Sequence, residues 1–146
     1  MQVNTGLAGM IEWDELDKAP GSERIKLRRV RLINNDMVTA DVDISKETII
    51  ELEYENLQPG SKMLASIMLK DHLGTEVMAS SNLTSANLEH DEWFNRPAPV
   101  GRYRTTCVIP ANFLNEGRYN IQVTVQTDIN RVEVLLTDAL TFTVHE

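Results

Sequence analysis

The chain has 146 residues, of which 42% are hydrophobic and 25% are charged, and its formal net charge at pH 7 is −8. That length fits one globular domain with a buried core. The acidic balance argues against a nucleic-acid partner, because affinity for phosphates comes from Lys and Arg side chains. Cys107 is the single cysteine, which excludes an internal disulfide and favours a cytoplasmic setting. The sequence shows no signal peptide and no apolar run long enough to span a bilayer.

Residues 1–22 are predicted to form an N-terminal segment or linker, and residues 23–146 to form the domain. The segment is acidic around Trp13 and ends in a turn signal at Pro20-Gly21. Trp13 is its one large apolar side chain. We expect Trp13 to cover an edge of the domain or to lie at a subunit contact.

Residues 24–33 predict the first strand of the domain. The apolar phase set by Ile25 and Leu27 shifts at Arg28-Arg29, which indicates a β-bulge. Residues 34–36, Asn-Asn-Asp, then favour a turn. The strand also holds the basic cluster of the sequence, which we interpret as a solvated face: Lys26, Arg28, Arg29 and Arg31.

Short strands follow along the rest of the chain. They are predicted at residues 48–55, 63–70, around 77–79, 102–109, 119–126, 131–136 and 140–144. Residues 82–101 are the longest irregular stretch, which is typical of a binding loop. Eight or nine strands without a strongly helical segment predict an all-β fold, an immunoglobulin-like antiparallel β-sandwich. Tyr119 enters its strand directly after Gly117 and Arg118, as the tyrosine of a tyrosine corner does.

Motifs of nucleotide-binding and hydrolytic sites are absent, because the sequence has no G-x-x-x-x-G-K-[ST] and no G-x-S-x-G. Cys107 lies mid-strand, so we expect it in the core and not as a nucleophile. His72, His90 and His145 are scattered without metal-ligand spacing. We therefore expect no cofactor, no metal and no enzymatic activity. The carboxylates leave two alternatives, a facing glycosidase pair and a Ca²⁺ site at residues 89–92.

One predicted strand carries an unusual polar face. Apolar and polar side chains alternate strictly over residues 119–126, so one face is buried and the other exposed. The exposed face has amides and a hydroxyl where Lys and Glu are usual. We call these residues the amide row: Asn120, Gln122, Thr124 and Gln126. An amide offers two donors and an acceptor in one plane, which suits sugar hydroxyls. The alternative is an ordinary solvated surface.

Other side chains are candidates to extend such a site. Ser66 and Met68 lie beside the amide row if their strand pairs with it. The long loop supplies Trp93, with Phe94, as stacking surfaces for sugar rings, and His90 and Arg96 are next to them. The alternative for Trp93 is that it closes one end of the sandwich.

Two stretches resemble the C-terminal domain of the Wzt family, the ATP-binding subunits of ABC transporters that export O-antigen polysaccharide. They are "APGSERIKLRRVRL" at residues 19–32 and "PVGRYRTTCVIPANFLNEGRYNIQVTV" at residues 99–125. Trp13 also matches the family, and so does Gly60, which lies in a Pro-Gly turn. With these two residues the similarity extends over nearly the whole chain. The ATPase domain of the family is absent from this sequence, which leaves an excised domain or a free-standing homologue.

The resemblance implies an immunoglobulin-like domain that binds the exported polysaccharide and selects it for transport. It also implies a homodimer, partner ATP-binding and membrane subunits, and a cytoplasmic location peripheral to the inner membrane. Arg102 and Arg104 are further candidates for the carbohydrate site, ranked below the amide row because immunoglobulin topology places their strand in the opposite sheet. The alternative function is a structural module that dimerises or docks through Leu64, Met68 and Trp13.

Overall fold

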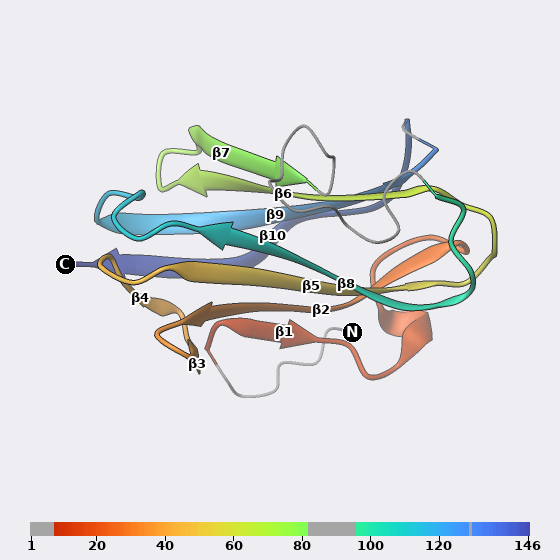
Figure 1. The fold of residues 1–146 in the computed structure, drawn as a ribbon, viewed down its shortest axis with the longest axis horizontal. Coiled ribbons are helices and arrows are strands. Elements are labelled where there is room, and N and C mark those ends of the chain that lie inside the picture. Colours follow the sequence, from red (N-terminus) through yellow and green to blue (C-terminus); the bar gives the residue numbers. More distant parts are fainter. Residues whose placement is uncertain (1–7, 82–95, 129) are drawn as a thin grey trace.

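The computed structural model describes residues 8–81, 96–128 and 130–146. Ten strands in these residues form two sheets that lie one above the other as a β-sandwich (Figure 1). The predicted all-β sandwich is therefore confirmed. All strand pairs are antiparallel except the parallel pair of β4 and β10.

We call the first sheet sheet A; its strand order is β1-β2-β5-β8, with β3 paired to β2. Its strands are β1 (Met10–Glu12), β2 (Ile25–Asn34), β3 (Met37–Val38), β5 (Thr48–Asn56) and β8 (Gly101–Ile109). The second sheet, sheet B, has the order β4-β10-β9-β6-β7. Its strands are β4 (Asp41–Asp43), β6 (Met63–Asp71), β7 (Glu76–Ser81), β9 (Gly117–Thr127) and β10 (Arg131–His145).

The core lies between the sheets and is built by alternate residues of each long strand. In β9, Ile121, Val123 and Val125 are fully buried, as the period-two pattern predicts. The bulge predicted in β2 is confirmed, because the register with β5 shifts between Leu27 and Arg29. Leu27 and Val30 are three positions apart, so they would point to opposite faces of a regular strand. The bulge adds one residue between them, and both therefore lie on the inner face.

The last two predicted strands are one strand. β10 runs from Arg131 to His145 and pairs with β9 along its length, with register shifts between Val132 and Val134 and between Leu136 and Leu140. Two separate strands were expected, at 131–136 and 140–144, and the interval between them coincides with the second register shift. Bulges absorb the extra residues without ending the strand.

The N-terminal segment contributes to the sandwich. Its strand β1 pairs with β2, and a short 3-10 helix follows at Leu16–Lys18. Trp13 is only 3% exposed, and its backbone N–H donates to the carbonyl oxygen of Arg28 at 3.0 Å. The ring packs into the core just beyond the end of the edge strand β1, which fits the expectation that Trp13 covers an edge of the domain and not the alternative of a subunit contact.

The tyrosine corner is confirmed. The hydroxyl of Tyr119 donates to the backbone carbonyl of Asn115 at 2.8 Å, four residues upstream. The ring of Tyr119 stacks on Phe142 of β10 with a centroid separation of 5.6 Å. This contact fixes the start of β9, the strand that carries the amide row.

Candidate functional site

The amide row lies on the outer face of sheet B. Asn120, Gln122, Thr124 and Gln126 are all partly exposed, while the intervening residues of β9 are buried. β9 is paired along one side with β6 and along the other with β10, so its backbone is held from both directions (Figure 1). The row is therefore a set of parallel side chains on a central strand of the sheet.

The predicted neighbours on β6 lie beside the row. Ser66 is directly opposite Thr124, and Met68 is directly opposite Gln122. Opposite residues of an antiparallel pair project on the same face with Cβ atoms about 4.5–5.5 Å apart. The structure therefore brings these two sequence-predicted residues together with the amide row.

The two ends of the row differ in their hydrogen bonding. At one end the Asn120 amide donates to Asp138 at 2.7 Å, and the Lys70 ammonium donates to Gln122 Oε1 at 3.3 Å. At the other end, the side chains of Thr124 and Gln126 make no hydrogen bond to another described residue. That end of the row therefore differs from the Asn120 end, where both amides are hydrogen-bonded.

Sequence reasoning missed two apolar residues of this face. Val132 lies opposite Gln126 and Leu135 lies opposite Thr124 on β10, and their exposed fractions are 52% and 57%. The bulge at Val132/Val134 gives these two residues the same face although three positions separate them. The signal in the sequence was the pair Leu135-Leu136, since adjacent leucines in one strand point to opposite faces.

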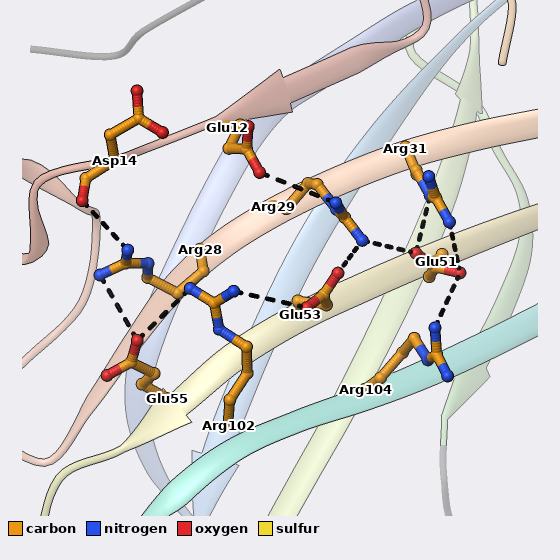
Figure 2. A network of polar contacts seen from close by, with 10 residues as sticks. All are labelled: Glu12, Asp14, Arg28, Arg29, Arg31, Glu51, Glu53, Glu55, Arg102 and Arg104. Atoms are coloured by element: carbon orange, nitrogen blue, oxygen red, sulfur yellow. Dashed lines mark hydrogen bonds and ion pairs between the residues drawn. The ribbon is translucent and has the colours of Figure 1, made fainter.

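Arg102 and Arg104 lie on β8, on the outer face of the other sheet. They face the glutamates of β5 (Figure 2): Arg102 is 3.5 Å from Glu55, and Arg104 is 3.9 Å from Glu51. The structure does not bring these arginines together with the amide row. Their assignment to the opposite sheet is as expected from immunoglobulin topology.

The basic cluster of β2 is part of the same surface. Arg31 binds Glu51 through Nε at 2.7 Å, Arg29 contacts both Glu51 and Glu53, and Arg28 is 3.4 Å from Glu55. These arginines are mostly covered, with side-chain exposures of 14–27%. The interpretation as a solvated face is therefore corrected for the three arginines, which form an ion-paired network, while Lys26 donates to the carbonyl oxygen of Ala19 at 3.3 Å. We call the network the charged lattice, and Figure 2 shows its residues: Glu12, Asp14, Arg28, Arg29, Arg31, Glu51, Glu53, Glu55, Arg102 and Arg104.

The remaining residues that the sequence singled out add little to the description of this site. His90, Trp93 and Phe94 lie outside the described residues, and Arg96 is exposed. Cys107 packs against the core, and burial raises the pKa of its thiol, opposed by a hydrogen bond with Ser80. A buried thiol with a raised pKa is a poor nucleophile at neutral pH.

Two hollows are formed by described residues, and no residue of the amide row lines either of them. A cavity of about 10 Å³ between β5, β6, β7 and β8 has room for about one water molecule. An open hollow beside the 3-10 helix is lined by acidic side chains, including Glu15, Asp17 and Glu23, and by Lys26. Among the described residues, no group of three or more His, Cys, Asp and Glu side chains is placed to hold a metal ion.

The fold and the face together define an all-β module with an open polar surface on one sheet. The sequence model of the Wzt C-terminal domain family matches residues 17–146. The chain therefore belongs to the Wzt C-terminal domain family, and this membership supports a role in an O-antigen ABC transporter. The resemblance found in the sequence is thus confirmed.

Comparison with solved structures shows the same fold. The crystal structure of the C-terminal domain of Wzt matches with a TM-score of 0.69 and 11% sequence identity, over 86% of this chain and 76% of that chain. A CARDB domain from Pyrococcus furiosus matches with a TM-score of 0.46 and 16% identity, over 92% of this chain and 99% of that chain. A TM-score of 0.46 is too low to establish common function or fold. No curated protein sequence shows significant similarity to this chain.

Proposed function

We propose that this domain is a non-catalytic carbohydrate-binding module that recognises O-antigen polysaccharide and selects it for export by an ABC transporter. The observation that carries the proposal is the hydrogen bonding of the amide row. In the part of the chain that the structure describes, Asn120 and Gln122 bond to neighbouring side chains, whereas Thr124 and Gln126 do not. Thr124 and Gln126 present hydrogen-bonding groups without partners among the described residues, on a strand that is paired on both sides. A ligand that binds there meets side chains on a backbone that is already fixed, so the entropy lost on binding is confined to ordering those side chains.

The chemistry of the row suits a sugar. Each Gln side chain offers two donors and an acceptor, and the Thr hydroxyl both donates and accepts, as sugar hydroxyls do. We place the binding site on Asn120, Gln122, Thr124 and Gln126, with Ser66 and Met68 beside them. The contributions of His90 and Trp93 stay predictions. We leave Arg102 and Arg104 out of this site because they lie on the other sheet.

The family suggests the setting in which the module acts. We propose that it works as a homodimer with the ATP-binding and membrane subunits of the transporter, on the cytoplasmic side of the inner membrane. In the described residues, no helix has the length and apolar character needed to cross a bilayer. This arrangement would present the amide row to polysaccharide before its export.

The test is a calorimetric or NMR titration of the 146-residue chain with the O-antigen polysaccharide exported by its own transporter. We expect saturable binding, and about fivefold to tenfold weaker binding for Gln126→Ala, because one hydrogen bond contributes about 1 kcal/mol. Arg104→Ala, on the opposite sheet, is the matched control and should bind as the wild type does. An unrelated O-antigen should not bind. Absence of binding at millimolar repeat concentration would reject the proposal.

The alternative is a structural module that dimerises or docks without binding glycan. Leu64 and Met68 are partly exposed on the same face, and the more exposed Val132 and Leu135 favour this alternative further. Trp13 does not support it, since that ring is buried. Sedimentation analysis of Leu135→Asn separates the two functions. Loss of a dimer together with unchanged glycan binding would assign this face to a protein interface.

A further inference from the structure

The outer face of sheet B contains a patch without ionisable side chains. Strand register places its residues in adjoining rows across β7, β6, β9 and β10. We call them the uncharged patch: Leu64, Ser66, Met68, Ala79, Gln122, Thr124, Gln126, Val132 and Leu135. In a chain with 25% charged residues, such a surface contrasts with the charged lattice on the other sheet.

Charged residues stand only at the two ends of the patch, as far as the described residues show. Lys70 lies opposite Asn120 at one end, where its ammonium donates to Gln122 at 3.3 Å and Asp138 accepts the Asn120 hydrogen bond. Lys62 and Asp128 follow at the other end, where the Asp128 N–H donates to the Lys62 carbonyl at 2.9 Å. Gln126 lies six positions beyond Asn120 in β9, so the row is about 20 Å long at about 3.3 Å per residue. That length accommodates several sugar units along the strand.

Across the strands, polar and aliphatic side chains lie in separate rows. The amide row runs along the middle, with Val132 and Leu135 on the β10 side and Leu64 and Met68 on the β6 side. We call these four residues the aliphatic margins. The hydroxyl groups of a pyranose ring can form hydrogen bonds with the row. Its C–H and methyl groups can pack against aliphatic side chains, which removes apolar surface from water. An anionic sugar placed over Thr124 and Gln126 would instead lose hydration without gaining a cation from the described residues beside it, because Lys70 lies toward the Asn120 end and bonds Gln122 there.

We infer that the ligand of this face is an uncharged polysaccharide, bound along β9 with its hydroxyls on the amide row and its less polar ring edges against the aliphatic margins. This inference rests on the proposed function and specifies its substrate class. Uronic acid or phosphate in the repeat is disfavoured over Thr124 and Gln126, where no described residue supplies a compensating cation, and Lys70 is already bonded to Gln122. Binding is accordingly insensitive to ionic strength, because salt screens only interactions between charges.

A pair of opposite charges at one exposed position tests the charge of the ligand. Ala79 lies on β7 opposite Met68, is exposed, and is outside the amide row, so Ala79→Glu and Ala79→Lys should both fold. Both variants and the wild type are screened on an array of purified O-antigen polysaccharides, with uncharged repeats and with repeats that carry uronic acid or phosphate. The screen is run at about 10 mM and about 500 mM salt, since at low salt charges act over more than 10 Å.

We expect binding only to uncharged repeats, with affinities of the two variants within about threefold of each other and no salt dependence. Tighter binding of Ala79→Lys than of Ala79→Glu by more than about tenfold, lost in high salt, would overturn the inference while the proposed function stands. Absence of binding to every polysaccharide, including the one exported by the chain's own transporter, would overturn the proposed function as well.

A second pair of variants tests the aliphatic margins. Leu135→Asn should weaken binding of the uncharged polysaccharide about fivefold, because the apolar contact is replaced by a group that holds water. Val108→Asn is the control, since Val108 is 52% exposed on the outer face of sheet A. Equal binding by Leu135→Asn and the wild type would remove the margins from the site.

Discussion

The outer faces of the two sheets are built by the same alternation but have opposite chemistry. On sheet A, alternate residues are Arg and Glu, and they bind one another across β2, β5 and β8 (Figure 2). On sheet B, alternate residues are amides, hydroxyls and aliphatic groups, and part of them have no partner among the described residues. A sheet face that is rich in polar side chains is therefore not, for that reason alone, a binding face. Sheet A pairs most of its charged side chains with one another, whereas Thr124 and Gln126 of sheet B have no side-chain partner among the described residues.

The largest expected effect is on the charged lattice. Glu51 is 7% exposed and accepts from Arg29 and Arg31, so Glu51→Ala takes the carboxylate from the partly buried Arg31 and one of its carboxylates from Arg29, which keeps Glu53. We expect a loss of about 2–3 kcal/mol in the free energy of unfolding, somewhat less than for a fully buried pair. Urea denaturation measures it.

Gln122→Ala is the matched control for that measurement on the other face. It should change the unfolding free energy by no more than about 0.5 kcal/mol, as surface substitutions usually do. Equal effects of the two substitutions would show that the faces do not differ in internal bonding.

A smaller effect concerns the inner side of sheet B. Glu133 is buried where β10 bulges, and its carboxylate accepts from Thr127 at 2.5 Å and pairs with Arg131 at 3.2 Å. Burial raises the pKa of this carboxyl, but hydrogen bonds from Ser22 and Thr127 and the charges of Arg131 and Arg24 outweigh it, so the pKa is lowered. The ionised carboxylate therefore stabilises the fold, in a pH window that follows from the direction of the shift.

We expect Glu133→Gln to lower the unfolding free energy by about 1–2 kcal/mol at pH 7. The lowered pKa means that the stabilisation is complete above the unfolded value of 4.5 and is lost as pH falls through the folded value. The difference between variant and wild type should therefore shrink in urea titrations at pH 3. A constant difference at both pH values would contradict a role for the charge.

The smallest effect is expected at the rim of the lattice. Arg104 is 61% exposed and lies 3.9 Å from Glu51, so its ion pair is weak and screened by solvent. Arg104→Ala should change the unfolding free energy by less than about 0.5 kcal/mol. A loss above 1 kcal/mol in the same denaturation assay would show that the lattice extends with full strength to β8.

Much of the fold was predictable because a half-buried strand leaves a period-two pattern. β5, β6 and β9 were found within one or two residues, and the Arg28-Arg29 phase shift located the bulge of β2. The tyrosine corner was found from Tyr119 and its neighbours. β1, β3 and β4 were missed because strands of two or three residues are too short to show a period.

The candidate site was partly predictable for the same reason. The shared face of the amide row follows from alternation alone, and the positions of Ser66 and Met68 follow once β6 pairs with β9. Val132 and Leu135 were missed because a bulge changes which residues share a face. His90 and Trp93 are outside the described residues, so their part in the site stays a prediction.

The sequence by itself determined the fold class, the polar face of β9 and the family. Alternation and turn residues are local properties, and family motifs are read directly from residue order. Only the tertiary structure decided that the Arg28–Arg31 cluster is ion-paired, that Trp13 is buried, and that Arg102 and Arg104 lie away from the amide row. These facts depend on which strands become neighbours, and strand pairing joins residues far apart in the chain.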